Sequence, residues 1–90
     1  MERFTISHYK MDCSSMFVNG GTLTVTDSEY IIEYGKKEVA RFCSADTTVS
    51  KAASELLYDG IRLWDKTQSV SLFFLKGSGT LKAVRAYFGI

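Results

Sequence analysis

The chain contains no proline, so its turns must come from other residues. The turn-forming clusters are Asn19-Gly20-Gly21, Asp27-Ser28, Gly35-Lys36, Asp59-Gly60, Lys66-Thr67-Gln68 and Gly77-Ser78-Gly79. Most neighbouring clusters lie about 6 to 10 residues apart, which is typical of short antiparallel strands joined by tight turns. This spacing excludes long helices from most of the chain.

Between the turns, apolar residues alternate with polar ones. In residues 22–26 three threonines alternate with Leu23 and Val25, and in residues 61–66 Ile61 and Leu63 alternate with polar side chains and Trp64. A period of two predicts strands with one buried face. Residues 30–34 and 70–75 are more continuously apolar, which predicts strands that are covered on both faces or lie near a barrel closure.

Two dipeptides predict tight hairpins. Asp59-Gly60 lies between residues 52–58 and 61–66, and Asn19-Gly20 precedes the alternating segment 22–26. Both central positions of such a turn favour a positive φ, which asparagine, aspartate and glycine adopt most readily.

The pattern changes after residue 77. Leu81, Val84 and Phe88 fall on one face at helical spacing, Ser78 or Thr80 can cap the first turn, and a glycine follows at residue 89. We therefore predict one amphipathic helix over residues 78–88.

These elements predict one small domain over residues 1–90. A chain of 90 residues has room for a single core, and an apolar content of 46% indicates a folded protein. The predicted class is mainly β with one helix. We expect an antiparallel barrel of six or seven strands over residues 4–75, capped at one end by the helix.

Several segments carry a resemblance to a known superfold. They are Gly-Thr-Leu-Thr-Val-Thr-Asp at 21–27, the strands expected at 30–34 and 39–42, Asp-Gly-Ile-Arg-Leu at 59–63, and the strand at 69–75 before the helix. In this order they resemble the pleckstrin-homology-like (PH-like) superfold, in particular the small bacterial PH-like and GRAM-like domains. The likeness covers residues 13–88 and implies a binding or assembly module. Residues 13–35 contain no Lys or Arg. The likeness therefore does not extend to the clustered cations of inositide-binding PH domains.

Charge is distributed unevenly. The formal net charge is +1, which argues against a nucleic-acid binder. Residues 1–65 hold seven bases and ten acids, whereas residues 66–90 hold four bases and no acid. The candidate binding residues are Lys36, Lys37, Trp64, Lys66, Lys82 and Arg85, and we expect Lys82 and Arg85 to be exposed on the helix. We expect a module that binds a protein partner or itself; the alternative is a weak contact of the basic C-terminal end with anionic membrane lipids.

The residue inventory gives little support for catalysis or metal binding. The only histidine is His8, and the only cysteines, Cys13 and Cys43, form no metal-binding pair in sequence. The glycine-rich stretch at 76–80 completes no phosphate-binding motif and is interpreted as a turn with a helix cap. We therefore expect no enzyme, cofactor or metal. The N-terminus lacks the pattern of a signal peptide, so the expected location is cytoplasmic. The lipid-binding alternative would place the protein at the membrane periphery.

Three aromatic residues are of particular interest. Trp64 falls on the same face of its strand as Arg62 and on the face opposite to Ile61. It is therefore either partly exposed, which suits an interface, or buried under the helix. Phe73 and Phe74 are adjacent, so in a regular strand they face opposite sides of the sheet. One of them needs a cover other than the main core, supplied by the helix or by a partner subunit.

Overall fold

The structure is a computed structural model, and it describes residues 1–52, 54 and 56–90. Within this described part the chain forms nine strands, one 3-10 turn (η1) and one helix. Their order is β1 (Glu2–Thr5), β2 (His8–Met11), β3 (Val18–Asn19), β4 (Thr22–Val25), β5 (Glu29–Tyr34), β6 (Lys37–Cys43), η1 (Ser44–Asp46), β7 (Thr48–Ala52), β8 (Tyr58–Trp64), β9 (Ser69–Leu75) and α1 (Gly79–Phe88).

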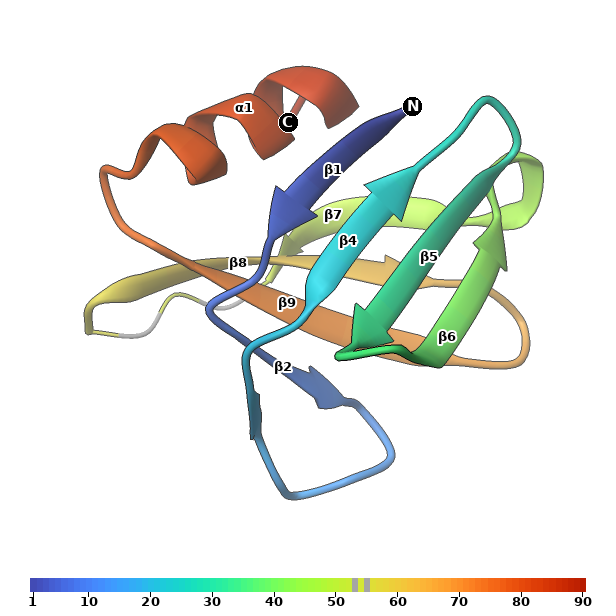
Figure 1. The fold of residues 1–90 in the computed structure, drawn as a ribbon, viewed down its shortest axis with the longest axis horizontal. Helices are drawn as coiled ribbons and strands as arrows, with labels where there is room; N and C mark the ends of the chain where they lie inside the picture. Colours follow the sequence, from blue (N-terminus) through green and yellow to red (C-terminus); the bar gives the residue numbers. More distant parts are fainter. Residues whose placement is uncertain (53, 55) are drawn as a thin grey trace.

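The strands form two antiparallel sheets (Figure 1). The first sheet has the order β1-β4-β5-β6, and the second has the order β3-β2-β9-β8-β7. The prediction of a mainly β fold with one C-terminal helix is confirmed. The strand predicted at 69–75 has the bounds of β9.

A single long hairpin joins the two sheets at one corner. Its arms bend at Ile6-Ser7 and Gly20-Gly21, so that β1 pairs with β4 in the first sheet and β2 with β3 in the second. Across the bend the Ile6 amide donates to the Gly21 carbonyl at 2.9 Å, and the Gly20 amide donates to the Ser7 carbonyl at 2.8 Å. Asn19-Gly20 is therefore not the hairpin turn that the sequence predicted. The positive φ of Gly20 and Gly21, 96° and 121°, serves the passage from one sheet to the other.

The opposite corner is open. The chain passes from β6 to β7 through η1, and no strand ladder joins β6 to β7 among the described residues. The side chain of Gln68 crosses this corner, and its Nε2 donates to the Arg41 carbonyl at 2.8 Å. The two sheets therefore do not close into the expected barrel, because a side-chain contact stands where closure would need a ladder.

The Asp59-Gly60 hairpin prediction is wrong. Both residues lie inside β8, where Gly60 pairs with Phe73 on one side and with Ala52 on the other. Of the expected first arm, 52–58, residues 53 and 55 lie outside the described residues. A Cβ on Gly60 would lie 2.9 Å from Ala52 Cβ and 3.0 Å from Phe73 Cε1. Glycine is therefore required here for close packing rather than for a turn.

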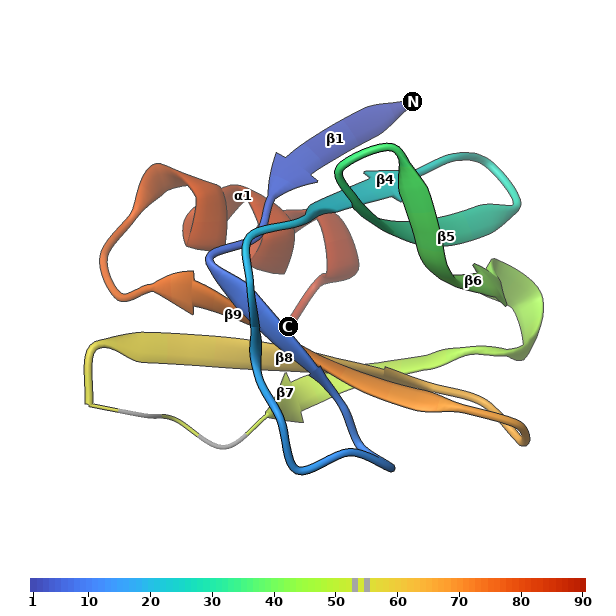
Figure 2. The same ribbon diagram turned by 60° about the horizontal axis from the view of Figure 1, so that its bottom comes forward.

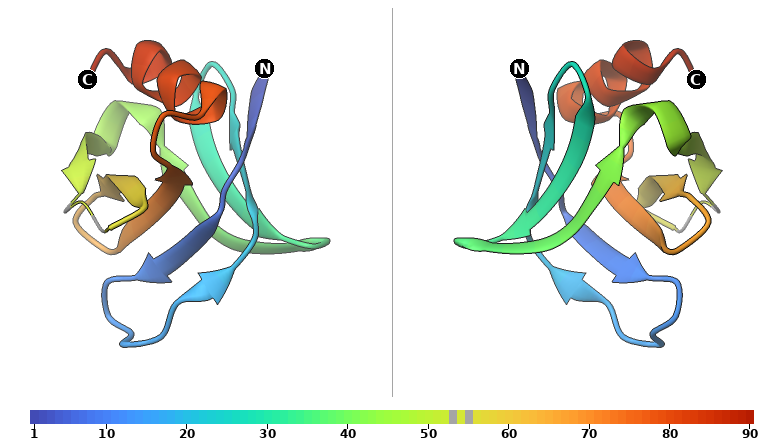
Figure 3. Two further views of the ribbon diagram at one scale, coloured as in Figure 1. Left: turned by 90° about the vertical axis from the view of Figure 1, so that its left-hand side faces the viewer. Right: turned by 90° about the vertical axis from the view of Figure 1, so that its right-hand side faces the viewer.

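The helix lies over one end of the space between the sheets (Figure 3). Leu81 and Val84 are buried in the core, and the Ser78 side chain accepts from the Leu81 amide at 3.2 Å. Gly89 adopts the left-handed conformation, and the Ile90 amide donates to the Arg85 carbonyl at 3.0 Å. The left-handed glycine and the Ile90 bond make the Schellman ending that the glycine predicted. The predicted helix and its position at one end of the fold are confirmed.

Candidate functional site

The outer face of the second sheet, the face turned away from α1, differs between its two halves. Along β9, Val70, Leu72 and Phe74 point into the core, so Phe73 and Leu75 point outward. Phe73 is paired with His8 on β2 and Leu75 with Tyr58 on β8, and directly paired residues share a face. One half of this outer face is therefore aromatic and apolar.

His8 lies at the centre of a cluster of rings. Its imidazole stacks on Phe73 with centroids 4.8 Å apart and planes 9° apart. Tyr58 and Phe17 meet the imidazole edge-on at 4.7 and 5.4 Å, and Phe17 also meets Phe73 at 5.8 Å. Ser7 Oγ lies 3.3 Å from His8 Nδ1. We call His8, Phe17, Tyr58, Phe73 and Leu75 the aromatic face.

The cluster explains how Phe73 is covered. Phe74 is 1% exposed in the core, and Phe73 is only 6% exposed although it lies on the outer face. The cover over Phe73 comes from its own chain, through β2, β8 and the segment before β3, and not from the helix or a partner subunit as the sequence suggested. His8 is buried among these rings, a role that its position in the sequence did not indicate.

Around the rings lies a rim of exposed apolar side chains. Phe17 is 48%, Leu57 58% and Leu75 51% exposed, and Met16 and Leu56 are more exposed still. The β2–β3 hairpin and the segment before β8, which carry four of these residues, both lie on the side of the second sheet away from α1 (Figure 2). Exposed apolar side chains gathered on one side of a sheet are typical of a contact site.

The other half of the same outer face is polar and ionic. Asp12 accepts from Arg62 Nε at 2.9 Å, from Ser71 Oγ at 3.0 Å and from Ser69 Oγ. Partial burial acts to raise the pKa of Asp12, but the hydrogen bonds from Ser69, Arg62 and Ser71 outweigh it, so the pKa lies below its ordinary value. The carboxylate therefore stays charged and fixes the Arg62 side chain.

Trp64 lies at the far end of this polar half. The residue is 38% exposed, and the Arg62 guanidinium carbon lies 5.6 Å from the ring centroid. This is the geometry of a cation–π contact. Of the two positions that the sequence allowed for Trp64, the structure has the exposed one and not burial under the helix.

The six predicted binding residues do not gather into one site. Lys36 and Lys37 lie at the turn between β5 and β6, while Trp64 and Lys66 lie at the end of β8 and the turn after it. Lys82 and Arg85 lie on α1, which Figure 1 shows at the opposite side of the molecule from both turns. Lys66 borders a depression that is also lined by Asp46 and Asp65, so two carboxylates offset its positive charge.

Lys82 and Arg85 do share one groove. It has a volume of about 400 Å³ and lies between α1 and Asp59 of β8. Lys82 is exposed as expected, but Arg85 is half-buried, with Nη2 3.7 Å from Asp59 Oδ2. The expectation that both cations are exposed is therefore wrong for Arg85, because Asp59 on the neighbouring strand draws it inward.

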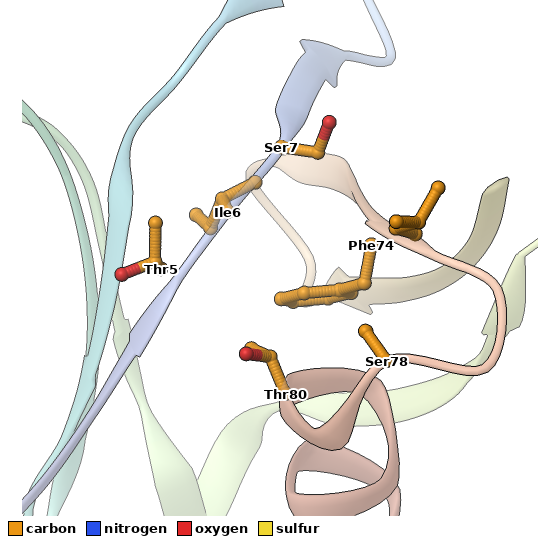
Figure 4. Close-up of a pocket in the computed structure, with 7 residues that line it drawn as sticks. Thr5, Ile6, Ser7, Phe74, Ser78 and Thr80 are labelled. Atoms are coloured by element: carbon orange, nitrogen blue, oxygen red, sulfur yellow. The ribbon is translucent and has the colours of Figure 1, made fainter.

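A small cavity lies where the β1–β2 bend approaches the start of α1 (Figure 4). It measures about 190 Å³, and Ile6, Phe74, Ser78 and Thr80 are among its lining residues. Sites for small-molecule ligands usually measure about 300 Å³ or more. This cavity therefore suits a single apolar side chain better than a cofactor.

No group of three potential metal-ligating side chains occurs among residues 1–52, 54 and 56–90. Cys13 and Cys43 are both free and exposed. The glycine-rich stretch before α1 caps the helix through Ser78, as interpreted from the sequence. In the part of the chain that the structure describes, no helix is long and apolar enough to cross a membrane.

Comparison of the chain with known protein families, with curated proteins and with solved structures finds no match. The candidate site was only partly indicated by the sequence. The sequence indicates Phe73 as a residue in need of cover, and the adjacent apolar pair Leu56-Leu57 is a second local signal. The sequence does not assign His8, Phe17 and Tyr58 to this site, because they lie far apart in the chain and only strand pairing brings them together.

Proposed function

We propose that this protein is a non-catalytic, cytoplasmic binding module of PH-like architecture that engages a protein through the aromatic face. The observation that carries the proposal is the exposed apolar rim around the His8–Phe73 ring stack. Side chains of this size rarely remain in contact with water over a contiguous area unless another surface covers them.

The order of elements supports the PH-like assignment. Two antiparallel sheets share a bent hairpin at one corner, and a C-terminal helix lies over one end. The resemblance implies short antiparallel strands followed by one C-terminal helix, and elements in this order support the proposal. The open corner between β6 and β7 departs from the closed barrel that the resemblance implies. A shared fold does not transfer a function, so the binding role rests on the aromatic face.

The composition of the face favours a protein ligand. Aromatic residues, methionine and arginine are enriched in the centres of protein interfaces, and Phe17, Tyr58, Met16 and Arg62 all lie on this side of the sheet. The rings are held by one another, so little side-chain entropy remains to be lost on binding.

The proposal is tested by photo-crosslinking in cells. A photoreactive amino acid replaces Leu57 on the exposed apolar rim. In a matched control it replaces Tyr34, which is similarly exposed but lies at the end of β5 in the first sheet. We expect position 57 to crosslink to a defined peptide identified by mass spectrometry, and position 34 to give none. Equal or absent crosslinking at both positions would refute the proposal.

The alternative function is weak binding to anionic membrane lipids through the basic C-terminal end. The exposed Lys82 favours it, whereas the pairing of Arg85 with Asp59 and the position of Lys66 in the turn between β8 and β9 weaken it. Sedimentation with neutral and anionic vesicles at low and moderate salt separates the two functions. Salt-sensitive pelleting with anionic vesicles alone, lost in the Lys82→Glu/Arg85→Glu variant, would establish the alternative.

A further inference from the structure

We infer that the groove between α1 and β8 binds a phosphate monoester group. This site is separate from the proposed function, because the groove lies beside the helix and not on the aromatic face. Its volume of about 400 Å³ falls within the range of small-molecule sites. Two cations line the groove, Lys82 and Arg85, and their surroundings identify the occupant as an anion.

Arg85 has a buried donor without an acceptor. Its Nε is buried and has no hydrogen-bond partner among the described residues. Its Nη2 lies 3.7 Å from Asp59 Oδ2, which makes an ion pair but is longer than a hydrogen bond. Nearly all buried polar atoms in folded proteins are hydrogen-bonded. The guanidinium of Arg85 therefore lacks an acceptor that Asp59 does not supply.

The other two arginines that form ion pairs are different. Arg41 donates to Glu29 and Glu38, and Arg62 donates to a carboxylate and a hydroxyl. Both of these side chains are 47% exposed, whereas the side chain of Arg85 is 28% exposed. Water can satisfy exposed donors more readily than buried ones. The most buried of the three guanidinium groups therefore has the fewest acceptors.

Lys82 adds a second positive charge to the same groove. It lies three residues before Arg85, so both side chains are on the same side of α1. Among the described residues that line the groove, Asp59 is the only acid, and its Oδ1 already accepts from Ser54 Oγ. The groove therefore keeps a net positive charge. Residues 66–90 contain no acid that could neutralise it.

These cations favour a phosphate monoester over a carboxylate. The guanidinium presents a planar fork of donors that matches the oxygens of a phosphate, and Lys82 adds a compact point charge. A phosphate monoester carries a charge of about −1.5 to −2 at pH 7, so it can engage both cations. A carboxylate carries a single charge. Gly77 and Gly79 bring no side chain to the groove, which leaves room for a tetrahedral group.

The site is tested by amide NMR spectra of the whole chain during a titration with glycerol 3-phosphate at constant ionic strength. The proteins compared are the unaltered chain, Lys82→Gln and Arg85→Gln in the groove, and Lys37→Gln as a control. Lys37 is an exposed cation at the start of β6. Circular dichroism checks that each variant folds. Because Lys82 is exposed, Lys82→Gln decides the outcome if Arg85→Gln fails to fold.

We expect the signals of residues 77–85 to move and to saturate, with a dissociation constant of about 1 mM. Lys82→Gln and Arg85→Gln should each weaken binding about tenfold, since each removes a charged hydrogen-bond donor. Lys37→Gln should bind as the unaltered chain does. Signals that do not saturate, or equal binding by all four proteins, would overturn the inference.

Vesicles that contain phosphatidic acid, whose headgroup is a phosphate monoester, identify the source of the group. Pelleting that glycerol 3-phosphate reverses would assign the site to a lipid headgroup. Saturable binding of glycerol 3-phosphate without pelleting would assign it to a soluble ligand. Pelleting that glycerol 3-phosphate does not reverse, and that Lys82→Gln and Arg85→Gln leave unchanged, would overturn the role of the groove.

Discussion

The outer faces of the two sheets differ although both belong to one small domain. On the first sheet, Arg41 donates to Glu29 and Glu38, each at 2.7 Å, and these ion pairs are exposed. On the second sheet, half of the outer face is a stack of rings with an exposed apolar rim. Ion pairs are suited to water, whereas the rim side chains Phe17, Leu57 and Leu75 keep about half of their surface in water unless a second surface covers them. Under the proposed function the first sheet stays in contact with solvent and the second sheet docks.

The largest effect should come from the inner side of the second sheet. Phe74→Ala leaves a cavity in the closed core and should lower the free energy of unfolding by about 3 to 5 kcal/mol. Phe73→Ala should cost about 2 kcal/mol less, because exposed neighbours on the outer face can collapse onto the space. Urea denaturation of both variants measures the difference. Equal losses would mean that the ring cluster is core rather than a contact surface.

Gly60→Ala should have the next largest effect. The added methyl group would lie within about 3 Å of Ala52, Phe73 and the Leu72 carbonyl, so the ring cluster must shift. Overpacking of this kind costs about 1 to 3 kcal/mol. The Ala52→Gly/Gly60→Ala double variant relieves one of these clashes and should recover part of the loss in thermal unfolding. No recovery would show that the Phe73 ring, rather than Ala52, limits the space.

The local signals in the sequence were reliable where neighbouring residues decide the structure. Ser78 caps the helix, Gly89 ends it, and the alternation of Ile61 and Leu63 gave the buried face of β8. The Asp59-Gly60 prediction failed because glycine serves turns and close packing alike, and only the position of Phe73 distinguishes the two.

The candidate site depends on longer-range pairing. The contact between Phe17 and Phe73 joins residues 56 positions apart, and the stacking of His8 on Phe73 requires that β2 pair with β9. Periodicity within a single strand shows which side chains share a face, but it does not show which strands are neighbours. Local charge indicates which residues are cationic but not how far apart the fold places them, and here they lie on separate turns and on the helix.

The polar half of the second sheet predicts a measurable pH dependence. The folded pKa of Asp12 lies below its unfolded value of about 3.9. The stabilisation is therefore present in full above pH 4 and is lost as the pH falls through the folded pKa. Asp12→Asn should cost about 1 kcal/mol at pH 7 and flatten the decline in acid. Urea unfolding between pH 2 and 7 tests this, and an unchanged acid profile would show that Asp12 does not stabilise Arg62.

The smallest effect should come from the outer face of the first sheet. Arg41→Met removes exposed ion pairs with Glu29 and Glu38, and such pairs contribute little in water. The midpoint of thermal unfolding should stay within experimental error at physiological salt. Lys51→Met, on the exposed edge of the second sheet, serves as a matched charge control. A marked destabilisation specific to Arg41→Met would show that the first sheet depends on its ion pairs.

The most direct test of the docking face is the crosslinking comparison, with Leu75 added as a second position because it lies beside Tyr58 on the aromatic face. We expect positions 57 and 75 to crosslink to the same protein and position 34 to give no crosslink. Crosslinks from position 34 alone would contradict the choice of face. Crosslinks from none of the three positions would contradict the proposed function.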